Sequence, residues 1–303
     1  MRIIGERLNP GVAACSQALN AMDPGPIQDL ARRQVEAGAD LLDLNIGAAL
    51  HAPPHLMPWL VDTVQAAVDV PLVLDARDPE ALAAGARRLH EPGILNSSDA
   101  SEPRLMRLLD AAWKHQASLV VQPIVGDSRP ETALDRVSVV RSYVLPKTNR
   151  VGYPRERLVF DALFYPVTSA PEQVPEALRS IQYYKAATEW RSPVIGGISN
   201  ISYGAPRELR RALHRVLLAM AHGAGLDLAI ADPLDGALME ALRVLEGAPP
   251  ATPRHRFLLA VREAWSVLAP LDMTAWEGDP SLADDVRALR ILQSGVQRSR
   301  GVY

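Results

Sequence analysis

The sequence predicts a (β/α)8 barrel, also called a TIM barrel, followed by a C-terminal helical extension. Short apolar runs alternate with longer amphipathic segments, and eight such units are complete by about residue 246. The first run is not followed by the glycine-rich phosphate loop that a doubly wound nucleotide-binding sheet would need. A chain of 303 residues with 48% hydrophobic residues is long enough to build one large core of this kind.

The strands are predicted where short apolar runs lie between turn-forming residues. The first begins at the second residue of the chain, and the seventh leads through Gly196-Gly197 to Asn200. In chain order the predicted strands are residues 2–8, 41–47, 71–75, 93–96, 118–125, 158–161, 194–200 and 226–232.

The helices are predicted from apolar spacing and from their start signals. Residues 26–37 carry Ile27, Leu30, Ala31 and Val35 at the spacing of one helical face. Three other helices begin with a proline, which is tolerated there because its missing N–H would be unpaired in the first turn anyway. These starts are Asp78-Pro79-Glu80, Ser101-Glu102-Pro103 and Ala205-Pro206-Arg207.

The alternation stops after Gly247-Ala248-Pro249-Pro250. Residues 257–268 and 281–296 both have helical patterns, and no strand candidate follows them. We therefore expect a barrel over residues 1–250 and a helical extension over residues 251–303. The extension is expected to pack on the barrel or on a neighbouring subunit, not to form an independent domain.

The composition is typical of a soluble enzyme. Lys and Arg number 32 against 35 Asp and Glu, so the net charge of −3 gives no reason to expect a nucleic-acid partner. The single cysteine, Cys15, excludes an internal disulfide and a multi-cysteine zinc site. No apolar stretch approaches the roughly 20 residues of a membrane span. Because the chain starts as a strand and not as a signal peptide, we expect no membrane association and a cytoplasmic location.

The C-terminal ends of the predicted strands carry carboxylates and carboxamides, and this is where barrel enzymes place their chemistry. The group contains no lysine for a Schiff base, and no histidine or cysteine of the kind used in hydrolytic zinc barrels, so no bound metal is expected. Carboxylates accept paired N–H groups and amides match a lactam edge, which favours a nitrogen-rich heterocycle as the ligand. The residues are Glu6, Asn9, Asp43, Asn45, Asp75, Asn96, Gln122, Asp161, Asn200 and Asp232.

Several motifs resemble those of the methyltetrahydrofolate:corrinoid protein methyltransferases, a branch of the pterin-binding barrels that also includes dihydropteroate synthase. They occur in the family's order over roughly residues 2–245. Each motif alone is short, and the ordered set carries the resemblance. The matching segments are residues 3–9 (IIGERLN), 31–34 (ARRQ), 37–40 (AGAD), 42–47 (LDLNIG), 74–75 (LD), 95–98 (LNSS), 197–202 (GISNIS) and 225–232 (GLDLAIAD).

The resemblance implies an SN2-like transfer of the N5-methyl group between methyltetrahydrofolate and a cobalamin carried by a separate corrinoid protein, in either direction. It implies that Asn200 is the catalytic residue, which hydrogen-bonds N5 and assists its protonation. It also implies a homodimer, the usual assembly in the family. The pterin ring is assigned to Asp75, Asn96, Asp161, Gly196 and Ser199.

The remaining candidates each have a second interpretation. Asp43 and Asn45 either contact the ligand or tie together layers inside the barrel. Glu6 either contacts the ligand or pairs with a buried arginine. Asp232 either contacts the ligand or caps the following helix. The other three candidates are Asn9, Gln122 and Arg207, the last of which either meets the glutamate tail of folate or is solvated.

Some positions depart from the family pattern. Ala76 follows Asp75 where the family usually has serine or threonine, and Ala162 follows Asp161 where the family usually has proline. Residues 122–153 match poorly. These departures leave the corrinoid partner and the direction of transfer open.

Two alternatives remain. A dihydropteroate synthase would bring a lysine near the seventh strand, whereas the seventh and eighth strands here end in Ser199-Asn200 and Ala231-Asp232-Pro233. The other alternative is a non-catalytic pterin-binding subunit of a methyl-transfer complex.

Overall fold

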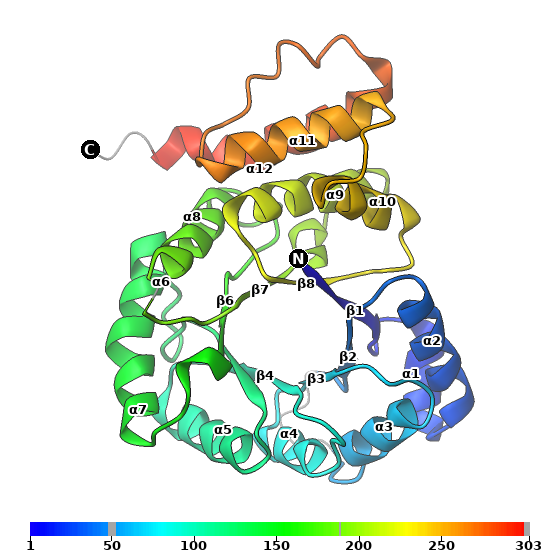
Figure 1. Ribbon diagram of the computed structural model, residues 1–303, viewed down its shortest axis with the longest axis vertical. Helices are drawn as coiled ribbons and strands as arrows, with labels where there is room; N and C mark the ends of the chain where they lie inside the picture. Colours follow the sequence, from blue (N-terminus) through cyan, green and yellow to red (C-terminus); the bar gives the residue numbers. More distant parts are fainter. Residues whose placement is uncertain (48–52, 188, 300–303) are drawn as a thin grey trace.

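Eight parallel strands close into a barrel in the order in which they occur in the chain, which confirms the predicted fold class (Figure 1). A computed structural model describes residues 1–47, 53–187 and 189–299. The strands are β1 (Arg2–Leu8), β2 (Leu41–Asn45), β3 (Leu72–Asp75), β4 (Ile94–Ser98), β5 (Ser118–Val121), β6 (Leu158–Asp161), β7 (Val194–Gly197) and β8 (Leu228–Ala231).

The inside of the barrel is filled by one apolar side chain from each strand. This layer closes the barrel below the C-terminal ends of the strands, so that a ligand can enter only from the mouth. The large apolar strand residues next to these members belong to a second, larger core that includes residues of the surrounding helices. The eight members of the inner layer are Ile4, Leu41, Val73, Ile94, Val120, Val159, Ile195 and Leu228.

Helices surround the barrel and follow the strands in alternation (Figure 1). Asp78 caps the start of α4 as predicted, because its side chain accepts a hydrogen bond from the Glu80 N–H (2.9 Å). The α-helices around the barrel are α1 (Ala13–Ala21), α2 (Pro24–Glu36), α3 (Leu56–Gln65), α4 (Pro79–Ala86), α5 (Glu102–Lys114), α6 (Ala133–Val139), α7 (Leu145–Arg150), α8 (Gln173–Ala186), α9 (Arg207–Ala224) and α10 (Gly236–Leu245). Shorter segments are the π-helix η1 (Val140–Val144) and the 3₁₀ helices η2 (Arg155–Arg157) and η3 (Ser199–Ser202).

Several predicted strands differ in length from the observed ones: 41–47 and 226–232 are longer than β2 and β8, 93–96 ends two residues before β4 does, and the largest differences are in β5 and β7. β5 ends at Val121 instead of residue 125, because Pro123 has no N–H to donate to a neighbouring strand. β7 ends at Gly197 instead of residue 200, and the chain then forms η3. Asn200 therefore lies on a short helix above the strand end.

The extension consists of α11 (Pro253–Ser266), η4 (Pro280–Leu282) and α12 (Ala283–Ser299). It lies outside the ring of barrel helices, where α11 packs on α9 and α12 packs on α9 and α8 (Figure 1). The contact is close at Gly223, because a Cβ atom there would meet the backbone carbonyl of Arg262. The extension thus shares an interface with the barrel helices α8, α9 and α10.

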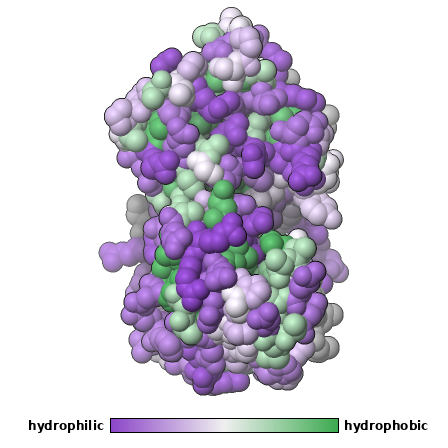
Figure 2. Space-filling view, turned by 90° about the vertical axis from the view of Figure 1, so that its right-hand side faces the viewer, coloured by the Kyte–Doolittle hydropathy of each residue, from purple (hydrophilic) through white to green (hydrophobic). Residues whose placement is uncertain are grey.

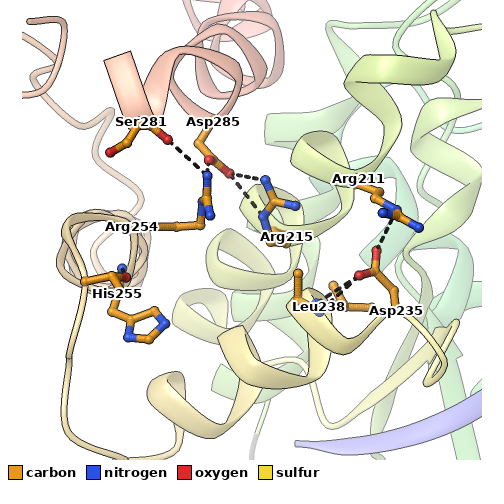
Figure 3. A network of polar contacts seen from close by, with 10 residues as sticks. Arg211, Arg215, Asp235, Leu238, Arg254, His255, Ser281 and Asp285 are labelled. Carbon is orange, nitrogen blue, oxygen red and sulfur yellow. Dashed lines mark hydrogen bonds and ion pairs between the residues drawn. The ribbon is translucent and has the colours of Figure 1, made fainter. Parts of the chain in front are cut away.

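A buried ion network joins the extension to the barrel (Figure 3). Asp285 of α12 is fully buried and accepts hydrogen bonds from Arg215 of α9 (2.9 Å) and Arg254 of α11 (2.8 Å). Arg254 also donates to the Ser281 carbonyl (3.0 Å). One carboxylate therefore links three helices.

The outer surface seen from the side is mainly hydrophilic, with hydrophobic residues interspersed in small areas (Figure 2). Among the described residues, no helix has both the length and the apolar character needed to cross a membrane.

Candidate active site

A cavity of about 310 Å³ lies at the C-terminal mouth of the barrel. Its walls come from every strand or the loop that follows it, because the carboxyl ends of parallel strands meet on one side of a barrel. It opens into two larger hollows of about 780 and 720 Å³, with which it shares Asn45 and Asp75 on one side and Ser199 and Asn200 on the other. The lining residues are Glu6, Asn9, Asp43, Asn45, Asp75, Asn96, Ser97, Gln122, Asp161, Ile195, Gly197, Ser199, Asn200 and Ile230.

The register of the sheet brings the ends of three neighbouring strands to one level. Asn45 pairs with Asp75, and Asp75 pairs with Asn96. Both carboxamides donate to Oδ2 of Asp75, at 2.8 Å from Asn45 and 3.4 Å from Asn96. Oδ1 of Asp75 accepts no hydrogen bond from any described residue, so it is available to a ligand.

Asp161 is held on the opposite side of the cavity. Its Oδ1 accepts the Leu163 N–H (2.8 Å), and its Oδ2 accepts the side-chain amide of Gln122 (3.2 Å). Burial raises the pKa of the Asp161 carboxyl, and these two hydrogen bonds oppose that rise. Because an oxygen can accept a second hydrogen bond, Asp161 can receive N–H groups from a ligand while Gln122 fixes its orientation.

Glu6 is bonded to the segment that carries Asn200. Its Oε2 lies 2.6 Å from the Ser199 hydroxyl oxygen. Burial raises the pKa of Glu6, and the Asp232 carboxylate raises it further. Glu6 has no ion pair with an arginine within the described residues, because the adjacent Arg7 pairs with Asp232 instead (3.3 Å). The alternative interpretation of Glu6, a buried pair with arginine, is therefore wrong.

Asp43 lies deeper in the cavity and is 3% exposed. Burial raises its pKa well above the ordinary value, and the charges of Asp75 and Glu6 raise it further. Its Oδ1 has no hydrogen-bond partner among the described residues. Burial also raises the pKa of Asp75, to about 6, where the Asn45 hydrogen bond opposes the rise and the charge of Asp161 adds to it. The cavity is thus lined by carboxyl groups that lack cationic partners in contact, and it favours a ligand rich in N–H donors.

Asn200 projects from η3 at the edge of the cavity, where it is exposed. Gly197 makes room for it, since a Cβ atom at this position would lie 2.6 Å from the Asn200 amide nitrogen. A residue larger than glycine at the end of β7 would therefore displace the carboxamide from the cavity.

The model of the pterin binding enzymes matches residues 5–232 of the chain. The chain belongs to the pterin-binding enzyme family. The match covers the second half of β1 and all of β2 to β8, and it confirms the resemblance seen in the sequence motifs.

Among curated relatives of this pterin-binding enzyme is a methylcorrinoid:tetrahydrofolate methyltransferase of Eubacterium limosum. It is 27% identical over 254 residues, which are 80% of this chain and 89% of the relative. A methionine synthase of Mycobacterium leprae is 26% identical over 238 residues, 75% of this chain but only 20% of that protein. This chain therefore spans about a fifth of the methionine synthase.

Solved structures of dihydropteroate synthases share the barrel. The Yersinia pestis enzyme with a pterine-sulfa conjugate superposes with a TM-score of 0.58 at 15% identity, covering 81% of this chain and 91% of that one. A Xanthomonas albilineans synthase gives a TM-score of 0.60 at 19% identity, with coverages of 82% and 93%. At these identities the likeness shows the fold alone.

Three predicted residues of this pterin-binding enzyme do not line the cavity. Gly196 faces outward against the Phe164 ring, and Gly197 takes its place in the wall. Arg207 is exposed at the start of α9. Asp232 pairs with Arg7 and accepts the Leu234 N–H (2.9 Å), while the cap of α10 is Asp235.

Sequence reasoning missed the apolar part of the wall, Ile195 and Ile230, together with Ser97 and Gly197. A period of two along β7 connects Ile195 with Gly197, so the inward face of this strand could have been found from the pattern. Among the described residues, no group of three or more His, Cys, Asp or Glu side chains is arranged to hold a metal ion.

Proposed function

We propose that this pterin-binding enzyme transfers the N5-methyl group between methyltetrahydrofolate and the cobalt of a corrinoid protein, in either direction. The observation that carries the proposal is the convergence of Asp75, Asn96, Asp161 and Asn200 on one cavity at the barrel mouth. The name of the Eubacterium limosum relative supports the same reaction class.

The pterin ring offers N–H donors and a lactam along one edge. We expect Asp75 and Asp161 to accept the N–H groups, since each is a carboxylate fixed by neighbouring amides. Asn96 would complete the recognition at the lactam, because a carboxamide both donates and accepts hydrogen bonds. Ile195 and Ile230 supply apolar wall beside these groups.

The size of the cavity fits the ring and not the whole folate. About 310 Å³ is at the lower end of small-molecule sites. The rest of the substrate and the incoming corrinoid would use the two adjoining hollows, which share walls with the cavity.

Asn200 would act on the reacting amine. A tertiary amine leaves only when its nitrogen is protonated, so the site must favour positive charge on N5 as the methyl departs. The carboxamide oxygen of Asn200 can accept a hydrogen bond from N5–H⁺ and carries no charge of its own. The corrinoid, bound to its own protein, would supply the cobalt that exchanges the methyl group.

Binding measurements on the purified protein test the proposal. Methyltetrahydrofolate should bind without added metal, and Asp75→Asn, Asn96→Ala and Asp161→Asn should each weaken it by about 1–3 kcal/mol, because each leaves a buried ring group unpaired. Asp110→Asn, an exposed carboxylate on α5, is the matched control and should bind normally. Unchanged affinity in all three cavity variants by titration calorimetry would remove the pterin assignment.

A two-protein assay distinguishes the methyltransferase from the alternatives. A methyltransferase changes the corrinoid absorbance when methyltetrahydrofolate is added, whereas a non-catalytic pterin-binding subunit binds the folate without that change. A dihydropteroate synthase would instead condense a pterin pyrophosphate with p-aminobenzoate. The absence of lysine and arginine from the cavity walls within the described residues favours the methyltransferase.

A further inference from the structure

The proposed reaction needs a proton at N5, and Asn200 cannot provide it. A carboxamide stabilises a protonated amine but has no acidic proton to give. A proton donor must therefore reach the same region of the cavity. The inference below rests on the proposed function, because it concerns the origin of that proton.

Four carboxyl groups line the cavity, and their hydrogen bonds show which of them could donate a proton. Both oxygens of Asp161 accept N–H groups, and Asp75 accepts two amides, so both are held as acceptors. Asp43 has no hydrogen bond to a hydroxyl among the residues that the structure describes, and it lies deep in the barrel. Glu6 alone among the four is bonded to a hydroxyl, that of Ser199, at 2.6 Å.

Ser199 is well placed to pass on a proton. It lines the cavity, and it directly precedes Asn200 on η3. A serine hydroxyl can accept one proton while it donates another, so it can connect a carboxyl group to a ligand atom that the carboxyl does not touch.

The groups around Glu6 allow it to hold a proton. It is buried, and burial disfavours its charged form. Asp232 faces it from the loop after β8, and its negative charge raises the pKa of Glu6 further. Asp43 lies near it on β2, and the charge of Glu6 raises the pKa of Asp43 in turn. Arg7, the next residue on β1, and the Ser199 hydroxyl oppose them.

We propose that Glu6 is the proton donor of the methyl transfer and that the Ser199 hydroxyl carries its proton to N5. As the Ser199 O–H proton bonds to N5, the Glu6 proton bonds to Ser199 Oγ, and Glu6 becomes a carboxylate. The electron pair of the breaking methyl C–N bond stays on N5, while the methyl carbon bonds through an electron pair from the cobalt of the corrinoid acceptor. In the reverse direction the N5 proton returns to Glu6 by the same path.

Glu6→Gln tests the donor with little change in shape. Glutamine keeps a hydrogen bond to Ser199 but has no acidic proton, so folate affinity should stay within about 3-fold while single-turnover transfer at pH 7 falls about 100-fold, within the usual range for losing a general acid. The wild-type rate should fall as pH rises through the pKa of Glu6, and this dependence should vanish in the variant. Glu208→Gln, on the exposed start of α9, is the control.

A second readout needs no corrinoid. Methyltetrahydrofolate labelled with ¹⁵N at N5 reports the protonation of the bound amine by NMR. In the wild type N5 should stay protonated to higher pH than in Glu6→Gln, by about one pH unit, because the Glu6 carboxylate stabilises the nearby cation.

Three results would overturn the assignment. One is a normal rate and pH profile in Glu6→Gln. The second is that Asp43→Asn, and not Glu6→Gln, abolishes the pH dependence. The third applies if Glu6→Gln fails to fold: a normal transfer rate in Ser199→Ala would then exclude the path through the hydroxyl. Failure of the proposed function itself differs from all three, because the wild-type protein would then bind no folate or transfer no methyl group.

Discussion

At the scale of single residues, the carboxyl groups of the cavity lower the stability of the folded protein before any ligand binds. Asp75 is buried beside other carboxyl groups, and its pKa rises to about 6. An acid whose pKa is raised on folding destabilises the folded state when it is ionised. In the proposed complex, ring N–H groups would offset this cost, and affinity should therefore fall as pH drops below about 6.

Asp75→Asn should stabilise the ligand-free protein at neutral pH. Below the ordinary pKa of 3.8 both states are protonated and Asp75 imposes no penalty, whereas the penalty grows between about pH 4 and pH 6 and is complete above that. The variant should gain about 1–3 kcal/mol at pH 8 and much less at pH 4.5. Urea unfolding at both pH values measures this, with the exposed Asp284→Asn as the control. A variant that is less stable than wild type at pH 8 would show that the carboxylate is favourable there.

Asn200→Ala should slow methyl transfer more than it weakens folate binding. The amide oxygen interacts more strongly with protonated N5 than with the neutral amine, so its loss is felt mainly in the transition state. We expect a loss of about 2–4 kcal/mol in activation free energy, the range seen for comparable contacts. Stopped-flow absorbance at saturating folate gives the rate, and calorimetry gives the affinity. A normal saturated rate would reduce Asn200 to a residue that shapes the cavity.

At the scale of elements, η3 decides where Asn200 lies. Besides the Ser199–Glu6 hydrogen bond (2.6 Å), the contacts that hold this turn include Ser202 to His214 of α9 (2.7 Å) and Ser202 to the Ser199 carbonyl (3.2 Å). The Val167 N–H also donates to the Ile201 carbonyl (3.0 Å), and the Thr168 hydroxyl donates to the Tyr203 carbonyl (2.8 Å). His214 is largely buried, and burial lowers its pKa. The turn is therefore fixed by the helix that follows it and by the β6–α8 loop.

Removing the His214 contact should loosen this turn. His214→Phe keeps a ring of similar size but loses the hydrogen bond to Ser202, and one such bond is worth about 0.5–1.5 kcal/mol. We expect the transfer rate to fall by about 2–10-fold with little change in folate affinity. His214→Gln is the matched variant, because its side-chain amide can replace Nε2 as donor and should restore the rate. Equal losses in both variants would point to packing instead.

The sequence predicted the elements of the barrel but not how they end. Apolar runs and proline starts are local signals, so the strands and helix starts could be placed from them. The end of β7 depends on what lies beyond the sheet, and the pattern Ile198-Ser199-Asn200-Ile201 looks as much like a strand as like a 3₁₀ turn. For this reason Asn200 was assigned to a strand end.

The sequence likewise predicted some residues of the candidate site and not others. Residues whose position follows from strand register, such as Asp75 and Asn96, fell into the cavity as expected. Side chains whose partner is far away in sequence did not, since nothing near Asp232 announces its pair with Arg7. Which of two adjacent glycines faces inward also depends on the pleat of β7, and the sequence alone did not settle it.

At the scale of the whole molecule, the extension is joined to the barrel by charge as well as by apolar packing. Asp285 is fully buried between Arg215 and Arg254. Because Arg215 is itself buried, its positive charge needs the negative charge of Asp285 as a partner. Homodimer formation stays a prediction, and the faces of α8 and α9 under the extension are already covered within one chain.

Asp285→Ala should destabilise the protein by about 3–5 kcal/mol, the usual cost of leaving one buried charge unpaired. Asp284→Ala provides the control, because it removes the exposed neighbouring carboxylate from the same helical turn. Thermal unfolding should show a lower Tm for Asp285→Ala only. Equal Tm values for the two variants would show that water compensates Arg215 in solution.

The bonds of two consecutive residues give α9 a double attachment. His214 reaches inward to the turn that carries Asn200, and Arg215 reaches outward to α12. A chimera in which another tail replaces α11 and α12 would therefore have to retain an acidic group opposite Arg215 or substitute an apolar residue for it. Otherwise the unpaired charge of Arg215 would lie next to His214, which holds the turn that carries Asn200. A change in the C-terminal tail would then alter the rate of turnover.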